Sequence, residues 1–489
     1  MKIPKVFILV FLVFFVIELK SNEILISKPI EVNNHSPKFK IIGKNDAGYW
    51  IRNYGKNEER IDLYDNGLNF ILSRTILVKR NNFFPLTYSL NEKGASFFYT
   101  DYHKKNFYLC SSLISNRIES GNEKVIDTMI FQSSSEDMRI SFSYSLNKQN
   151  VVFFVPMYVN NQLSQMRVIS MRNTGEIIFK SSIPVSRENA QAFAEDALVD
   201  NNGNTYLFMK YEIPNISTFY EVKKIAKNGV VIDSCFLNFA NNIFNDPILQ
   251  IDEKNKKLIC YAFLSGAAIA KPGANSLSNF SINLDSMKVV SASEFNFSDS
   301  FIEDVTNGVV KTNGALYTFK IKKVIPTIDG GSVCIAESFY KEDNEVRDGI
   351  DMGMLPFGGS GYPPSTRIVN IFHYNDILVF YFNKEGKCDK YEIIRKKQVT
   401  ENDNGSFSSF FVANNRTSLK LLFVDDIALK TDFVQHDLSN SLELKQKILL
   451  NEDEKNLMLI PKMAVQTQVN EVVLPSYRNN DFRLIKINF

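Results

Sequence analysis

Residues 147–158 read NKQNVVFFVPMY, a short polar turn followed at once by a strongly apolar run. Aromatic and β-branched residues favour strands, and a polar turn that leads directly into such a run favours a hairpin. The same order of turn and apolar strand recurs along the whole chain. The other turns are residues 45–48, 91–94, 201–203, 252–255, 329–331, 414–416 and 468–470.

The spacing of these turns predicts the fold class. Most are separated by about 46 to 56 residues, which is the repeat length of a four-stranded propeller blade. The two intervals from 252 to 329 and from 329 to 414 are longer and predict insertions. Further turns within the same repeats contain glycine, which supplies the positive φ of a tight hairpin. They are YDNGL (64–68), RNTGE (172–176), AKNGV (226–230) and NKEGK (383–387).

We therefore predict an all-β fold, a β-propeller of four-stranded antiparallel blades, with eight blades favoured and seven as the alternative. A series of separate β-sandwiches would not repeat the same four-strand cycle. The last repeat supplies only three strands before the chain ends at Phe489, whereas a spare strand lies at Ile24–Val32. Pairing that strand with the last blade would remove two open sheet edges. We expect the N-terminal strand to close the propeller in this way.

The N-terminus has the features of a secretory signal peptide over residues 1–21. Lys2 and Lys5 precede an apolar run of twelve residues, Val6–Ile17, which is too short to cross a bilayer as a helix. We expect an exported protein, periplasmic, on the cell surface or secreted, whose residues 22–489 form one propeller domain. The alternative is an uncleaved N-terminal anchor. We expect no membrane span after removal of the signal.

Composition excludes some functions. The chain has 56 basic and 54 acidic side chains, a formal net charge of +2, whereas a nucleic-acid binder normally has a basic excess. Its five cysteines are far apart, lack metal-ligand spacing and lie mostly in apolar alternating runs, so we interpret them as buried small hydrophobes. Helix signals are weak throughout the chain. Residues 186–197 (SRENAQAFAEDA) come nearest, and we expect at most one short helical turn there.

No catalytic or metal-binding motif is evident, and we expect no cofactor. The four histidines, His35, His103, His373 and His436, have no metal-ligand spacing, and none lies in a recognisable nucleophile motif. The turn at 200–204 (DNNGN) has the oxygen spacing of a calcium loop. Its twelfth position is Tyr211 instead of the bidentate Glu that such a loop needs, so we interpret it as a turn. Carboxylates such as Glu195, Asp196, Glu303, Asp304 and Asp376 are plentiful, but sequence assigns no pair of them to one cleft.

The most distinctive segment is 343–367, DNEVRDGIDMGMLPFGGSGYPPSTR, which interrupts the sixth repeat. Its glycines and prolines predict an irregular insertion, and long irregular loops in compact domains are usually either functional or disordered. As a binding loop it would offer aromatic and charged contacts. The candidate residues are Arg347, Asp351, Phe357, Tyr362 and Arg367. The alternative is an insertion without a specific ligand.

Three stretches carry a resemblance to a known group of proteins. They are DGGSVCIAES (329–338), YNDILVFYFNKEG (374–386) and KKQVTENDNGSFSSFFV (396–412), together with the repeat rhythm. In these stretches the chain resembles the exported propeller-like proteins common in Bacteroidetes. The resemblance implies an exported propeller and carries no established activity or catalytic residues.

Two functions fit these observations. The favoured one is an exported, non-catalytic binding or scaffolding propeller with an envelope protein or glycan as partner, because propellers present their loops at two rigid faces. The alternative is an exported glycan-acting hydrolase or lyase with carboxylates from several blades at the central channel. Acids with raised pKa values on the innermost strands would favour the enzyme.

Overall fold

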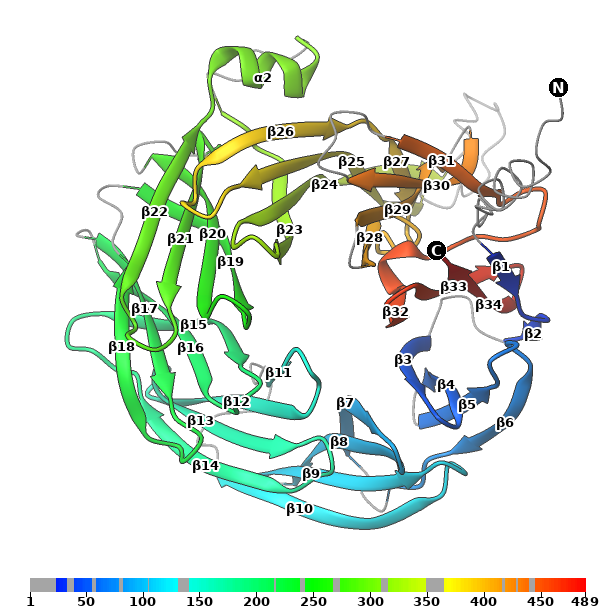
Figure 1. Cartoon of the computed structure of the whole chain (residues 1–489). Coiled ribbons are helices and arrows are strands. Elements are labelled where there is room, and N and C mark those ends of the chain that lie inside the picture. Colours follow the sequence, from blue (N-terminus) through cyan, green and yellow to red (C-terminus); the bar gives the residue numbers. More distant parts are fainter. Residues whose placement is uncertain are drawn as a thin grey trace, which may run out of the picture. The chain divides into compact units, whose positions relative to one another are not determined.

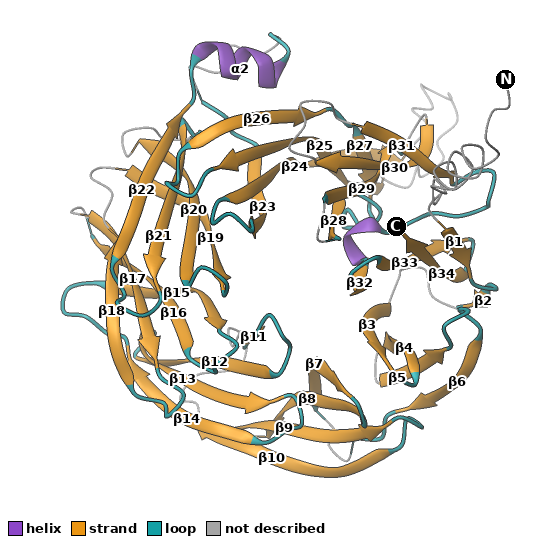
Figure 2. Ribbon diagram, viewed as in Figure 1, coloured by secondary structure: helices purple, strands orange, loops and turns teal. Residues whose placement is uncertain are grey.

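The computed structural model describes residues 23–32, 39–54, 59–78, 82–103, 105–130, 140–214, 217–237, 242–266, 273–308, 315–348, 365–415, 418–427, 430–438 and 445–489. These residues are almost entirely antiparallel strands in eight sheets (Figures 1 and 2). The chain divides into two compact units. One comprises the residues up to Ser73 and from Ser406 onward, and the other is Arg74–Gly405. The expected signal peptide, residues 1–21, lies outside the described residues.

The unit Arg74–Gly405 contains five sheets, each of consecutive strands paired in chain order. Sheet 2 is β7 (Phe83–Asn91), β8 (Gly94–His103), β9 (Asn106–Ser115) and β10 (Ser120–Ile130); sheet 3 is β11 (Ser141–Tyr144), β12 (Asn150–Val159), β13 (Gln162–Arg172) and β14 (Ile177–Pro184). Sheet 4 is β15 (Gln191–Val199), β16 (Thr205–Ile213), β17 (Ser217–Ile225) and β18 (Val231–Leu237); sheet 5 is β19 (Asn242–Asp252), β20 (Lys257–Gly266), β21 (Ser276–Asn283) and β22 (Val289–Asn296). Sheet 6 is β23 (Phe319–Pro326), β24 (Ser332–Asp348), β25 (Ser365–Phe382) and β26 (Cys388–Ile394), with β27 (Gln398–Glu401) also paired to β25.

Neighbouring sheets of this unit bury their faces against each other. The apolar core between sheets 2 and 3 contains Phe98 and Phe153, whose ring centroids are 5.1 Å apart. Further clusters join sheet 3 to sheet 4, sheet 4 to sheet 5, and sheet 5 to sheet 6. A sheet that alternates apolar residues on both faces can bury them only by such stacking.

The other unit holds three sheets. Sheet 1 is β3 (Phe39–Asn45), β4 (Gly48–Tyr54), β5 (Glu59–Tyr64) and β6 (Phe70–Thr75); sheet 7 is β28 (Phe410–Asn414), β29 (Leu419–Asp426), β30 (Lys430–Leu438) and β31 (Lys445–Asn451). Sheet 8 consists of β32 (Val465–Gln468), β33 (Glu471–Arg478) and β34 (Asp481–Asn488), completed by the N-terminal strands β1 (Glu23–Ile26) and β2 (Ile30–Glu31), which both pair with β34. The expected pairing of the N-terminal strand with the last blade is confirmed. The fold is a β-propeller of eight four-stranded blades.

The turns quoted from the sequence occupy equivalent places. All eight polar turns join the first strand of a sheet to the second, although residues 416–417 of the sheet 7 turn lie outside the described ranges. The glycine turns join the third strand to the fourth. Gly175, Gly229 and Gly386 each have a φ of 84°, as expected. Gly67 differs, because Leu68 takes the positive φ of 59° in that turn.

The helical expectation for residues 186–197 is wrong. Most of that segment belongs to strand β15, which has a β-bulge between Ala194 and Asp196. The bulge inserts one residue and breaks the period of two, so the apolar spacing imitates a helix. The helix α2 (Asp299–Thr306) lies elsewhere, and the Oγ of Ser298 caps it by accepting from the Phe301 N–H at 3.2 Å.

The insertion in sheet 6 is more regular than expected. Strands β24 and β25 continue past the rest of the sheet as a paired ribbon, with Asp343 opposite Asn370 and Asp348 opposite Ser365. Asp343–Asp348 and Ser365–Arg367 are therefore strand, because two adjacent extended segments can satisfy each other's backbone groups. Residues 349–364 lie outside the described residues.

Four of the five cysteines are buried in the sheet cores, as the apolar runs predicted: Cys110, Cys235, Cys260 and Cys334. Cys388 is half-buried. Within the described ranges, no helix has the length and apolar character needed to cross a membrane.

Candidate functional site

A cavity of about 980 Å³ opens between sheets 2 and 3. It lies at the edge of both sheets, where two turns of each sheet lie close together. These are the turn between the first and second strands (the first turn) and the turn between the third and fourth strands (the third turn). Its rim therefore consists of four turns. The lining residues are Asn91, Glu92, Lys93, Ala95, Leu113, Ile114, Ser115, Glu119, Ser120, Gly121, Gln149, Arg172, Asn173, Thr174 and Glu176.

Hydrogen bonds fix the four turns to one another. In sheet 2, the Asn116 side-chain amide donates to the Glu92 carbonyl at 2.9 Å, which joins the third turn to the first. In sheet 3, the Asn173 N–H donates to the Gln149 carbonyl at 2.9 Å. The buried Ser96 hydroxyl of sheet 2 then donates to the Asn173 carbonyl of sheet 3 at 2.7 Å. The rim is thereby held in place before any ligand arrives, which lowers the entropic cost of binding.

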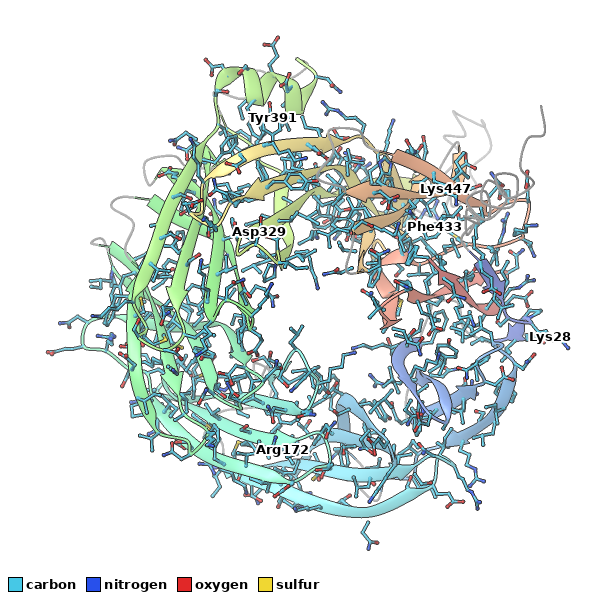
Figure 3. The ribbon with its side chains drawn as sticks, in the orientation of Figure 1. Lys28, Arg172, Asp329, Tyr391, Phe433 and Lys447 are labelled. Atoms are coloured by element: carbon cyan, nitrogen blue, oxygen red, sulfur yellow. The ribbon has the colours of Figure 1, made fainter. Side chains whose placement is uncertain are left out.

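Arg172, at the end of β13 (Figure 3), is the best anchored cation of the rim. Its Nη1 donates to Asn150 Oδ1 at 3.1 Å. Asn150 is completely buried, and its Nδ2 donates to the carbonyls of Asp200 and Asn201 in the first turn of sheet 4. The other guanidinium N–H groups of Arg172 have no partner among the described residues. A fixed guanidinium with unused donors is suited to a carboxylate or a carbonyl group of a ligand.

The lining combines an apolar floor with charges of both signs. Ala95 and Ile114 are buried, and Leu113 remains 54% exposed. Around them lie the exposed side chains of Glu92, Lys93, Glu119, Arg172 and Glu176. General acids are normally desolvated, whereas these glutamates are open to water. No aromatic side chain lines the cavity among the described residues, and the only Trp, Trp50, is fully buried in sheet 1.

A second group of charged residues lies on the first strands of sheets 4 and 5. β15 and β19 are neighbours, and each has a β-bulge, at Glu195 and at Asp246–Pro247. Desolvation, opposed by the Ala197 N–H and reinforced by the charge of Glu195, raises the pKa of Asp196 to about 6. Desolvation also raises the pKa of Glu195, with Lys210 opposing and Asp246 adding to the shift. These are acids with raised pKa values on the first strands of their sheets.

The residues proposed from the 343–367 insertion remain untested as a site. Asp351, Phe357 and Tyr362 lie outside the described residues. The backbone of Arg347 pairs with Thr366, and the exposed Arg367 lies opposite Val346. The structure thus places the two arginines on adjacent rungs of the β24–β25 ribbon.

The remaining candidates have structural roles. Asp200 uses both carboxylate oxygens within its own turn, accepting from the Asn204 N–H and Nδ2 at 2.8 Å each, as the turn interpretation predicted. His373 stacks on Tyr340, and His436 on Phe423. His103 is exposed, and His35 lies outside the described residues. Among the described residues no cluster of acids, histidines and cysteines has the geometry of a metal site.

The cavity residues were missed because sequence showed only their turns. RNTGE (172–176) was identified as a hairpin signal, but nothing in it indicates that its Arg and Glu face a neighbouring sheet. The one available signal was the concentration of charge in the turns of two successive repeats.

No family model and no curated protein sequence matches the chain. Among solved structures, the chain is similar to the WD40 domain of SCAP from fission yeast, at 9% identity, a TM-score of 0.41, and coverage of 96% of this chain and 98% of that one. The β-propeller domain of the Trilobed protease from Pyrococcus furiosus is similar at 8% identity, TM-score 0.34, and coverage of 88% and 96%.

Two further structures are similar. A member of the DUF4221 family from Bacteroides vulgatus has 12% identity, a TM-score of 0.28, and coverage of 88% of this chain and 100% of that one. A prolyl endopeptidase has 9% identity and a TM-score of 0.38, and the chain spans only 55% of its length. These identities and TM-scores support no conclusion about function. The resemblance to exported Bacteroidetes proteins stays a prediction.

Proposed function

We propose that this protein is an exported, non-catalytic binding propeller that holds an extended peptide segment of an envelope protein in the cavity between sheets 2 and 3. The observation that carries the proposal is the cavity itself, about 980 Å³ in volume, with a rim fixed by hydrogen bonds. Polar turns around an apolar floor are the usual composition of a binding site.

The composition of the lining favours a peptide over a glycan. A peptide offers backbone groups together with charged and apolar side chains. Arg172 can donate to its backbone carbonyls, Glu119 can bind its amides or a basic side chain, and Leu113 can pack against an apolar side chain. A neutral glycan would use little of that charge and would find no aromatic ring among the described lining residues. The peptide is therefore the better match.

The test selects peptides from a displayed random library against the full chain without residues 1–21, and measures the affinity of the selected peptides by fluorescence polarisation. We expect Arg172→Ala and Leu113→Asp each to weaken binding by tenfold or more. Arg117→Ala is the matched control, because Arg117 is exposed on the same rim and does not line the cavity. Failure to enrich any peptide, or equal binding by Arg172→Ala, would overturn the proposal.

Export rests on residues 1–21 and is tested separately. Fused to a reporter enzyme that is active only outside the cytoplasm, these residues should give activity, and a Lys2→Glu/Lys5→Glu variant with Leu12→Arg in the apolar run should not. A reporter that stays inactive with the native segment would refute export and leave the cavity proposal standing.

The acids on β15 and β19 support a second candidate, a glycan-acting hydrolase. In it Asp196, whose pKa of about 6 keeps part of the population protonated near neutrality, would donate a proton to the leaving oxygen as the glycosidic bond breaks. Ionised Glu195 would take a proton from the water that attacks the anomeric carbon. A screen of plant and bacterial polysaccharides for released reducing ends tests this function. Activity that disappears in Asp196→Asn and persists in Asp299→Asn would establish it over the binding role.

A further inference from the structure

A smaller cavity, about 190 Å³, lies between sheets 7 and 8. It is formed near the end of β29, the start of β30, the segment after β31 and the end of β33, so it is independent of the cavity between sheets 2 and 3. Most of its wall is apolar. The lining residues are Phe407, Val424, Ile427, Thr431, Glu452, Asp453, Leu457, Met458, Leu459 and Arg478.

Glu452 is the unusual member of this wall, because it is a carboxyl group that is only 4% exposed. Its backbone is fixed on both sides: its N–H donates to the Thr431 carbonyl at 2.9 Å, and its carbonyl accepts from the Leu457 N–H at 2.8 Å. One side-chain oxygen, Oε1, accepts from the Leu459 N–H at 2.6 Å. The other oxygen has no partner among the described residues. Because Glu452 lines the cavity, this oxygen is open to a ligand there.

The protonation of Glu452 decides what that ligand is. Burial is the main cause that raises its pKa to about 8; the Leu459 N–H opposes the shift, the negative charge of Asp453 adds to it, and Arg478 opposes it. At neutral pH the side chain is mostly a neutral acid. A neutral carboxyl group donates one hydrogen bond through its O–H, so Glu452 presents a donor to the cavity.

Arg478 supplies a second donor at the same wall. Its Nη1 donates to Asp453 Oδ1 at 2.9 Å and to the Leu457 carbonyl at 3.1 Å. The other guanidinium N–H groups have no partner among the described residues. Both carboxylate oxygens of Asp453 already accept a hydrogen bond, Oδ1 from Arg478 and Oδ2 from the Thr431 hydroxyl at 2.8 Å.

We propose that this cavity binds a small monocarboxylate with a short aliphatic tail. The carboxylate accepts from Arg478 and from the O–H of Glu452, and the tail lies against Phe407, Val424 and Ile427. The donors of Arg478 and Glu452 match an acceptor group of the ligand, and a carboxylate accepts at both oxygens. A volume of about 190 Å³ holds roughly six water molecules at about 30 Å³ each, which corresponds to a chain of four or five carbons.

The experiment uses butyrate as the probe and the full chain from residue 22 onward. Binding is measured by isothermal titration calorimetry, with butyramide as a neutral ligand of the same shape. We expect butyrate to bind at least tenfold more tightly than butyramide at about pH 6.5. Above about pH 8 the affinity for butyrate should fall by up to tenfold per pH unit, because ionised Glu452 loses its donor and repels the ligand.

Two variants locate the site, and one serves as control. Arg478→Met should lose at least tenfold in affinity, whereas Glu452→Gln should keep the affinity and lose its pH dependence, because an amide donates at every pH. Lys447→Ala, on the exposed face of β31, should behave as wild type. Absence of butyrate binding by the folded wild-type protein, equal binding of butyramide, or a flat pH profile would each overturn the proposal, and none of these outcomes requires a variant to fold.

Discussion

The Nζ atom of Lys396 lies 2.8 Å from Oε1 of Glu337, and neither side chain is exposed. Glu337 belongs to β24, and Lys396 to the segment that joins β26 to β27. The Lys396 ammonium also donates to Gln398 Oε1 at 2.9 Å and to the Tyr374 carbonyl at 3.0 Å. Burial lowers the pKa of Lys396 and the charge of Glu337 opposes that shift. The pair thus ties the segment before β27 to β24, next to β25, with which β27 pairs.

Removing one partner of this pair should be more harmful than removing both. Glu337→Gln leaves the buried ammonium without its counter-charge, which typically costs about 3–5 kcal/mol. Replacement of both residues, Glu337→Leu with Lys396→Met, should recover a large part of that loss, since apolar residues of similar volume often replace a buried pair at little cost. Urea denaturation of Glu337→Leu, Lys396→Met and the double variant measures the coupling. Additive losses would show that the two charges do not interact.

The N-terminal strand should stabilise sheet 8. The Ser27 N–H donates to the Leu484 carbonyl and the Leu484 N–H donates to Ser27 Oγ, both at 2.9 Å, and Ile24 packs on the core shared by sheets 7 and 8. Deletion of residues 1–32 would expose the edge of β34. We expect a Tm lower by several degrees and a greater tendency to aggregate, measured by calorimetry and light scattering.

The control for this deletion begins at residue 23 and keeps the strand. It should unfold at the same temperature as the chain that begins at residue 1. If the deletion of residues 1–32 unfolded at that temperature as well, the pairing of β1 and β2 with β34 would contribute nothing to stability.

Two glycines in the turns beside the cavity between sheets 2 and 3 allow the cost of backbone strain to be measured apart from the cost of a steric clash. Both have positive φ, 142° at Gly94 and 84° at Gly175. A Cβ at Gly94 would lie 1.9 Å from the Ile114 carbonyl oxygen, whereas at Gly175 the nearest atom, Ser96 Oγ, is 3.8 Å away. Gly175→Ala should therefore cost about 1 kcal/mol from strain alone. Gly94→Ala adds the clash and should cost more than about 3 kcal/mol. Equal losses in urea denaturation would contradict this distinction.

The sequence predicted the repeat because hairpin chemistry is local. A turn such as RNTGE (172–176) carries its own conformation, and the strands beside it alternate visibly, so the number and order of strands followed. The partner of the N-terminal strand was also predictable, because one repeat lacked a strand. Residues 186–197 were misread because a bulge at Glu195 is set by pairing with β16 and leaves no local signal.

The two cavities could not be predicted, for a physical reason. Each is formed between sheets, by residues that are distant in sequence. Arg172 is positioned by Asn150, which in turn donates to the first turn of sheet 4. Glu452 lines a cavity whose wall is shared by β29, β33 and the segment after β31. Burial and partner atoms, which decide the chemistry of both groups, are properties of this packing.

The free energy of unfolding should depend on pH through the titration of Glu452. Its pKa is about 8 in the folded protein and near the ordinary 4.5 when unfolded. Between these two values the folded state keeps a proton that the unfolded state has released. The free energy of unfolding should therefore fall as pH rises through this window, by up to about 1.4 kcal/mol per pH unit. The contribution is complete below about pH 4.5 and lost above about pH 8. Because other groups titrate as well, the measured quantity is the difference in urea stability between wild type and Glu452→Gln, whose amide does not ionise. We expect the wild type to lose stability relative to the variant from pH 5 to pH 8, and parallel curves would show that Glu452 is ionised in the folded protein.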